Sequence, residues 1–345
     1  MKNSKLHLVF YTLAHAVVDA MCAITVLQDR PLFSPMELLY FLVIYNFLAF
    51  ATQPIAGLFI DDTPRKKEII LVSFGMLLWG FALPVAQVVR VIVVGVANCL
   101  FHVAAGADVL EQSNHKMWPL GVFVSTGAVG LAVGMAYPAN VFVQTFFLSL
   151  LLLVSVGVLW LNPLKAPKVK AEPKAIPKIF WVVSAMLLFC ITIRSFMGFA
   201  RLAPFKGIAF LPIIMSVFVF AGKAMGGLFC DKFSTKWVIL VSVPLSALLY
   251  FLGDTHFVVW GLAQFLVNVS MPITLYLLYK AMPHAPAFSF GLAASFLLPG
   301  MVAALIIPKP IPDWVFAIIF VLNFVCLWVG NKVLSDRRMI KHQHK

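Results

Sequence analysis

The sequence predicts an all-α integral membrane protein in which twelve transmembrane helices form two pseudo-symmetric bundles of six. Three observations support this prediction. Of the 345 residues, 62% are hydrophobic and only 11% are charged, and the mean hydropathy is +0.99. Twelve apolar runs are long enough to cross a bilayer, and a short charged turn occurs twice, about half a chain apart. No soluble core needs so much apolar sequence, so most of the chain is expected to lie in lipid.

The expected spans follow from length, because a helix needs about 20 apolar residues to cross the hydrocarbon core. The runs that meet this requirement are approximately 6–27, 36–60, 68–86, 90–110, 118–138, 141–161, 179–200, 207–228, 237–252, 257–279, 287–307 and 313–331. The loops between them are short and leave no room for a soluble domain. The first run is longer than the core of a signal peptide and carries charged residues, so we expect it to be retained as a span.

The repeated turn divides the chain into two similar halves. GLFIDDTPRKK begins at Gly57, and GLFCDKFSTKW begins at Gly227. Each copy follows one apolar run and precedes another. In a membrane protein, such a duplication indicates a transporter whose site lies between the halves.

A basic segment separates the sixth span from the seventh. It reads NPLKAPKVKAEPKAIPK, and its prolines and lysines predict an extended, semi-rigid linker. We therefore expect an N-terminal six-helix bundle at 1–161, a basic Pro- and Lys-rich cytoplasmic linker at 162–178 and a C-terminal six-helix bundle at 179–345.

The net charge of +13 reflects topology rather than an acidic partner. With the N-terminus inside, most of the 26 Lys and Arg residues fall in cytoplasmic segments. This bias is the positive-inside rule, and it places both termini in the cytoplasm of a multi-pass protein of the plasma membrane. Nucleic acid is not an expected partner. The five cysteines are odd in number and form no CxxC pair, which argues against a disulfide framework or a zinc site.

The repeated turn resembles the signature loop between the second and third helices of the major facilitator superfamily, which has Gly, three residues, Asp, three residues and then basic residues. Thr235 replaces the first basic residue of the second copy. The twelve spans and the central basic linker extend the resemblance over the whole chain. The stretch NCLFH at 98–102 is similar to one in exporters of the fosmidomycin-resistance type. The matching residues of the turn are Gly57, Asp61, Arg65 and Lys66 in the first copy and Gly227, Asp231 and Lys236 in the second.

The resemblance implies that the two turns act as a conformational latch at the cytoplasmic face. Glycine permits close packing where a helix ends, and each Asp is expected at the N-terminus of the helix that follows it. Arg65, four residues after Asp61, is expected to pair with it, and Asp108 to complete the ionic cluster. The latch candidates are Gly57, Asp61, Arg65, Asp108, Gly227 and Asp231. The alternative is that these are ordinary topology charges.

Ionisable side chains near the middle of two spans indicate a coupling site. His15 and Asp19 lie four residues apart on one helix face, and Asn98 and His102 are spaced in the same way on the fourth span. Ionisable groups at that depth are costly unless they face a cavity or a partner. We predict that Asp19, His15 and His102 take up and release a proton. The alternatives are an internal hydrogen bond that joins helices, or a divalent-metal site.

The second half offers candidates for solute binding. Arg194 lies inside the seventh span and needs an anion or water, either Asp19 across the cavity or an anionic substrate. Gln264 and Asn268 give the tenth span a polar stripe. The predicted substrate-binding residues are Arg194, Asn98, Gln264 and Asn268. Lys223 is expected to reach toward the cytoplasm.

Together these features predict a proton-coupled secondary active transporter that moves a small organic solute by alternating access, with export or antiport as one mode. The expected partners are that solute, protons as the coupling ion and the lipid bilayer, and the expected state is a monomer. No enzymatic activity and no cofactor are expected. The sequence lacks a GxxxxGK[ST] loop, which argues against ATP-driven transport by this chain. The alternatives are a sensor or scaffold that keeps a transporter fold, a membrane enzyme, and a divalent-metal transporter that uses His15, Asp19 and His102.

Overall fold

The computed structural model describes residues 2–335 except for 165–177, 202–204, 206 and 209. This part of the chain consists of helices and short helical turns, with no strand. The first half contains α1 (Lys2–Leu27), η1 (Arg30–Leu32), α2 (Pro35–Asn46), η2 (Phe47–Ala51), α3 (Gln53–Asp61), α4 (Lys66–Ala82), α5 (Gln87–Gln112), α6 (Trp118–Ala136) and α7 (Val141–Trp160). The second half contains α8 (Lys178–Ala200), α9 (Leu211–Phe233), α10 (Thr235–Phe251), η3 (Gly253–Thr255), α11 (Phe257–Ala281), α12 (Pro286–Ser295), α13 (Leu297–Ile306) and α14 (Asp313–Ser335).

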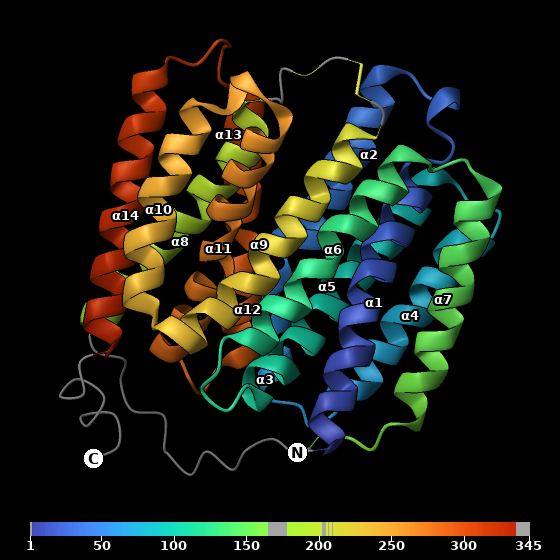
Figure 1. The fold of residues 1–345 in the computed structure, drawn as a ribbon. Helices are drawn as coiled ribbons and strands as arrows, with labels where there is room; N and C mark the ends of the chain where they lie inside the picture. The colour runs from blue at the N-terminus through green and yellow to red at the C-terminus, as the bar shows by residue number, and fades with distance from the viewer. Residues whose placement is uncertain (1, 165–177, 202–204, 206, 209, 336–345) are drawn as a thin grey trace.

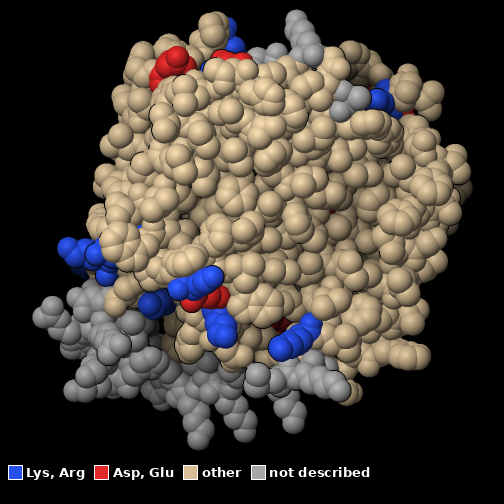
Figure 2. All heavy atoms as spheres, viewed as in Figure 1, with Lys and Arg blue, Asp and Glu red and all other residues tan. Residues whose placement is uncertain are grey.

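The predicted all-α membrane fold is confirmed, with a helix or a pair of helices at each of the twelve predicted positions. Ten of these segments are at least 18 residues long and apolar enough to cross a membrane. The other two, α4 and α10, have 17 residues each. Figure 2 shows the same property on one face of the molecule, where the charged side chains gather toward the two ends and leave an uncharged band between them.

Two of the spans are broken near their middle, and proline accounts for both breaks. The second span is divided into α2, the π-helical turn η2 and α3, next to Pro54. The eleventh is divided into α12 and α13, next to Pro299. Proline lacks an N–H and clashes with the carbonyl four residues earlier. At the second break, two hydroxyls of α8 donate to carbonyls beside it: Thr192 Oγ1 to that of Phe296 at 3.1 Å and Ser195 Oγ to that of Leu297 at 2.6 Å.

Glycines allow the helices of the first half to approach closely. A Cβ atom on Gly130 of α6 would lie 2.0 Å from the Ala16 carbonyl oxygen of α1, and one on Gly134 would lie 2.6 Å from that of Ala20. Such contacts exclude any larger residue, and small residues at helix spacing are typical of membrane interfaces. They hold α1 against α6 along its length.

The two halves meet chiefly through α6 with α9, and through α3 and α5 with α12 (Figure 1). In Figure 1, α3 and α12 lie at the end of the molecule where α1 begins and α14 ends, which we call the terminal face. The boundaries 1–161, 162–178 and 179–345 remain our proposal for the domains. Most of the predicted linker lies outside the described residues.

Candidate functional site

Asp61, the last residue of α3, joins the two halves at the terminal face. It accepts hydrogen bonds from the backbone amides of Ala287 and Phe288, at 2.7 and 2.9 Å. These residues begin α12 of the second half, directly after Pro286. A carboxylate there satisfies amides that have no partner within the helix, and it complements the positive end of the helix dipole. Asp61 therefore caps a helix across the interface.

Asp231 makes the mirror-image contact. It accepts from the backbone amides of Met117 and Trp118, each at 2.9 Å, where α6 of the first half begins. The prediction that each Asp caps the helix that follows it is therefore wrong. Each one caps a helix of the opposite half, because that helix start is brought against the turn by the interface itself. We call Asp61 and Asp231 the latch aspartates.

The glycine of each turn explains how the cap forms. A Cβ on Gly57 would lie 2.6 Å from Phe288 Cα, and one on Gly227 would lie 2.8 Å from Trp118 Cα. Both glycines therefore lie directly against the backbone that their aspartate caps, one helical turn away. The spacing of glycine and aspartate in the sequence motif thus matches one close approach followed by one cap.

At the terminal face, Asp108 pairs with a different residue from the one predicted. Asp108 lies 3.8 Å from Lys66 Nζ and accepts from the Tyr11 hydroxyl at 3.0 Å. Lys66 also pairs with Glu111. Arg65 is exposed and forms none of the ion pairs found among the described residues, nor does Asp61. The expected Asp61–Arg65–Asp108 cluster is therefore replaced by Lys66 with Asp108, because the buried lysine points inward.

The predicted coupling residues converge near the middle of the first half. His15 Nε2 lies 2.9 Å from His102 Nε2, 3.4 Å from Asp19 Oδ2, and His102 Nε2 lies 3.5 Å from Asp19 Oδ1. The Asn98 amide donates to Asp19 Oδ1 at 3.3 Å. Both imidazoles are buried, whereas the Asp19 side chain keeps 18% of its surface exposed. We call these three ionisable residues the α1–α5 cluster.

Hydrogen bonds fix which ring nitrogens carry protons in this cluster. His15 Nδ1 lies 2.8 Å from the Phe123 carbonyl and His102 Nδ1 lies 2.9 Å from the Asn98 carbonyl. A carbonyl only accepts, so both Nδ1 atoms must donate. In neutral rings, both Nε2 atoms then present lone pairs to each other and to the Asp19 carboxylate. The centre of the cluster consists of acceptors alone and requires a cation, either an added proton or a metal ion.

Gly127 of α6 makes room for this cluster and was not predicted as a site residue. A Cβ there would lie 2.2 Å from Asp19 Oδ2 and 2.5 Å from His15 Nε2. Even alanine would therefore displace the carboxylate or the ring. The sequence signal was the glycine-rich fifth span, which indicates close helix packing but not what the glycine faces.

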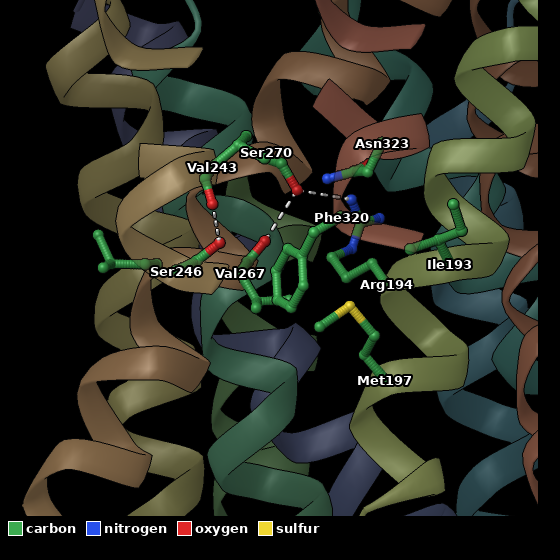
Figure 3. A pocket seen from close by; sticks show the side chains of 10 residues that line it. Ile193, Arg194, Met197, Val243, Ser246, Val267, Ser270, Phe320 and Asn323 are labelled. Carbon is green, nitrogen blue, oxygen red and sulfur yellow. Dashed lines mark hydrogen bonds between the residues drawn. The ribbon is translucent and has the colours of Figure 1, made fainter. Parts of the chain in front are cut away.

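In the second half, Arg194 lies beside a small pocket formed by α8, α10, α11 and α14 (Figure 3). Its Nη1 donates to Thr274 Oγ1 at 3.2 Å and to Ser270 Oγ at 3.5 Å. The predicted pair with Asp19 is not among the ion pairs of the described residues. Asp19 is held by its own cluster, so Arg194 is left with hydroxyl partners.

Among the other polar residues of the second half, Gln264 and Asn268 lie on the expected helix, whereas Lys223 differs from the prediction. Gln264 and Asn268 are buried on α11, and the Asn268 amide donates to the Gln264 carbonyl at 2.9 Å. Lys223 of α9 does not reach toward the terminal face. Its ammonium is close enough to both Asp19 and Arg194 to interact with them electrostatically. Lys223 is therefore a cation of the second half within electrostatic range of the Asp19 carboxylate, although the two are not among the ion pairs of the described residues.

No family model matches the chain, and no curated protein matches it in sequence. Solved structures do. FucP, a major facilitator superfamily transporter in the outward conformation, aligns with a TM-score of 0.67 over 96% of this chain and 98% of its own, at 13% identity. The chain has the major facilitator fold.

Two further structures agree. A variant of the E. coli fucose:proton symporter FucP aligns with a TM-score of 0.65, at 14% identity, over 96% of this chain and 98% of its own. A bacterial homologue of the iron transporter ferroportin, in an outward-facing state, aligns with a TM-score of 0.57, at 12% identity, over 100% of both chains. At such identities the likeness establishes the fold, and the function must be argued from the residues.

Proposed function

We propose that this chain is a secondary active transporter that carries a small organic solute across the plasma membrane by alternating access, coupled to protons. The observation that carries the proposal is the α1–α5 cluster. It is an acceptor-only centre in mid-span that interacts electrostatically with Lys223, a cation of the opposite half. A group that must gain a cation, placed where two movable bodies meet, is suited to coupling ion binding to movement.

The latch aspartates support alternating access. They form two reciprocal caps, one from each half, and both lie at the terminal face. Opening that face would expose four helix amides and two carboxylates to water at once. The caps therefore favour the state in which the terminal face is closed. With both termini cytoplasmic, as we propose, that state is open toward the outside, and a monomer is sufficient for the cycle.

Proton coupling follows from competition for Asp19. The carboxylate is attracted to Lys223 of the second half and to the histidine pair of the first. Uptake of a proton by the cluster neutralises the carboxylate's charge and weakens its attraction to Lys223. Loss of that proton restores the attraction and draws the halves together at mid-membrane. Asn98 holds Asp19 in place by its hydrogen bond.

A second candidate function is transport of a divalent metal ion, and one observation favours it. The candidate ligand atoms of His15, Asp19 and His102 all lie within 4.8 Å of one another. In both rings the other nitrogen, Nδ1, donates its hydrogen to a backbone carbonyl, as metal-binding histidines usually do. Lys223 opposes this reading, because a nearby ammonium repels a divalent ion more strongly than a proton.

Reconstitution in proteoliposomes tests the proposal. A pH-sensitive dye inside the vesicles reports proton flux when each member of a panel is added outside: glucose, fucose, lactate, gluconate, ethidium and Mn²⁺. We expect flux with an organic solute, and loss of that flux in Asp19→Asn. Flux with Mn²⁺ alone would favour the metal transporter. If the correctly folded protein moves none of these solutes, transport is refuted and the alternative of a sensor or scaffold remains.

A further inference from the structure

Two cysteines of the second half face each other across the contact between its first and last helices. Cys190 lies on α8 and Cys326 on α14, and both are free thiols. The two thiols lie within hydrogen-bond range of each other. The Cys190 thiol also donates to the Asn323 carbonyl of α14 at 3.7 Å, three residues before Cys326. A disulfide can form only where two cysteine side chains point toward each other, and these two do.

The packing of the two helices holds the thiols in this register. α8 and α14 lie against each other and run in opposite directions (Figure 1). On the terminal-face side of the thiols, a Cβ on Gly330 would lie 3.2 Å from Leu187 Cδ2. On the other side, the ring centroids of Phe196 and Phe316 lie 6.3 Å apart. Contacts on both sides therefore keep the two thiols opposed even without a covalent bond between them.

A buried cation lies next to one of the thiols. Arg194 follows Cys190 by four residues on α8 and interacts with it electrostatically. Only 8% of Arg194 is exposed, and it is absent from the ion pairs found among the described residues. A nearby guanidinium stabilises a thiolate, which is the nucleophilic form of cysteine. Arg194 therefore favours the thiolate of Cys190 when that sulfur attacks another.

Cys326 is the thiol that an oxidant meets first. Its side chain is partly exposed, whereas only 1% of Cys190 is exposed. Its neighbours on α14 include Leu322 and Val325, two exposed hydrophobic side chains, so the surface around Cys326 is expected to face lipid. An apolar oxidant that dissolves in the bilayer therefore has access to this thiol. Organic hydroperoxides belong to that class.

We propose that Cys190 and Cys326 are a redox-sensitive pair that an organic hydroperoxide converts to a disulfide between α8 and α14. The Cys326 sulfur attacks the terminal oxygen of the hydroperoxide and breaks the O–O bond, which leaves a sulfenic acid on Cys326 and, with the thiol proton, releases an alcohol. The Cys190 sulfur then attacks the Cys326 sulfur, forms the S–S bond and releases water. The two electrons lost by the thiols reduce the hydroperoxide, and an added dithiol reverses the bond.

Mass spectrometry of the purified protein in detergent tests the pair without a transport assay, so its result is independent of the proposed function. Cumene hydroperoxide is the oxidant, and N-ethylmaleimide then labels the remaining thiols of the unfolded protein. We expect two fewer labels per chain than in the untreated protein, one linked peptide that contains Cys190 and Cys326, and recovery of both labels with dithiothreitol. An unchanged number of labels, or a linkage between other cysteines, overturns the inference.

Variants separate the roles of the three residues. Cys190→Ser should stop the reaction at the sulfenic acid of Cys326, which dimedone captures as a mass adduct, and should form no linked peptide. Arg194→Gln should slow the linkage several-fold, whereas Arg194→Lys keeps the charge and should restore most of the rate. Cys99→Ser is the control, because that thiol contacts Thr52 in the first half, and it should link at the normal rate.

Two outcomes would contradict these roles. A loss of two labels in Cys190→Ser would show that Cys326 pairs with another thiol. An unchanged rate in Arg194→Gln would show that the guanidinium does not assist Cys190.

Discussion

At the terminal face the two halves make equivalent helix-capping contacts, whereas at mid-membrane they carry different ionisable groups. Asp61 and Asp231 occupy the same position in the two copies of the repeated turn, and each caps a helix of the other half. In the centre, the first half presents two histidines and a carboxylate, and the second half presents Arg194, a buried cation that donates to two hydroxyls. The two halves are therefore equivalent in their duplicated contacts at the terminal face but not in the ionisable groups that they carry at mid-membrane.

The largest expected effect comes from removing the carboxylate of the first half. Asp19→Asn keeps the shape and the hydrogen bond with Asn98 but removes the charge that Lys223 and the histidines share. Solute-driven proton flux in proteoliposomes should fall to the level of empty vesicles, while the protein remains folded. Glu37→Gln, an exposed carboxylate that caps α2, is the matched control and should keep its flux. Normal flux in Asp19→Asn would show that Asp19 is structural.

The next largest effect is expected from substituting Gly57 or Gly227, the two glycines that lie directly against the backbone of the other half. Gly57→Ala and Gly227→Ala each place a methyl group within 2.8 Å of backbone atoms of the other half, and we expect each to cost about 1–3 kcal/mol in the closed state. Maleimide labelling of Ala287→Cys, made in a background whose five native cysteines are replaced by serine, reports opening, because Ala287 of α12 is fully buried against Asp61 in the closed state. Gly75→Ala, where a Cβ meets nothing within 4 Å, is the control. Equal labelling of all three would refute the interface role of the latch glycines.

The caps themselves should matter less, and equally in the two halves. Asp61→Asn and Asp231→Asn each keep one acceptor but remove the charge at a helix N-terminus, which is typically worth about 1 kcal/mol. The same labelling assay should show similar opening in both variants and a roughly additive effect in the double variant. A much larger effect in one half would mean that the symmetry of the latch is only geometric.

Arg65 should contribute least. Its side chain is exposed and has no ion pair among the described residues, so Arg65→Gln should change the free energy of unfolding by less than about 0.5 kcal/mol. Lys66→Gln should cost more, because it leaves Asp108 buried beside Glu111 without their shared cation. If thermal unfolding in detergent ranks the two variants in the opposite order, the assignment of Lys66 as the partner of Asp108 is wrong.

The sequence was sufficient for the fold because hydropathy and repetition are properties of whole segments. Twelve apolar runs and one duplicated turn survive any error of a few residues at their ends. The positions of His15, Asp19 and His102 were also predictable, since four-residue spacing places side chains on one helix face and the resemblance paired their spans.

The partners of single charged side chains were not predictable. Whether Asp61 contacts Arg65 or the start of α12 depends on how the two halves dock, and the sequence of the turn contains no information about that docking. Lys223 could reach either end of its span by rotating its own side chain. Gly127 could be recognised as a packing residue, but only the docking of α6 on α1 shows that it lies against Asp19.

Proton uptake on solute binding tests the proposed coupling role of the α1–α5 cluster most directly. In weakly buffered detergent solution, a pH indicator dye measures the protons taken up as the solute that gives flux in the proteoliposome panel is added to the purified protein. The account predicts uptake of about one proton for each solute molecule bound, because solute binding and proton binding favour each other in a coupled transporter. Asp19→Asn should still bind the solute but take up no proton. Solute binding with no proton uptake in the unmodified protein, or with the same uptake in Asp19→Asn, would contradict the account.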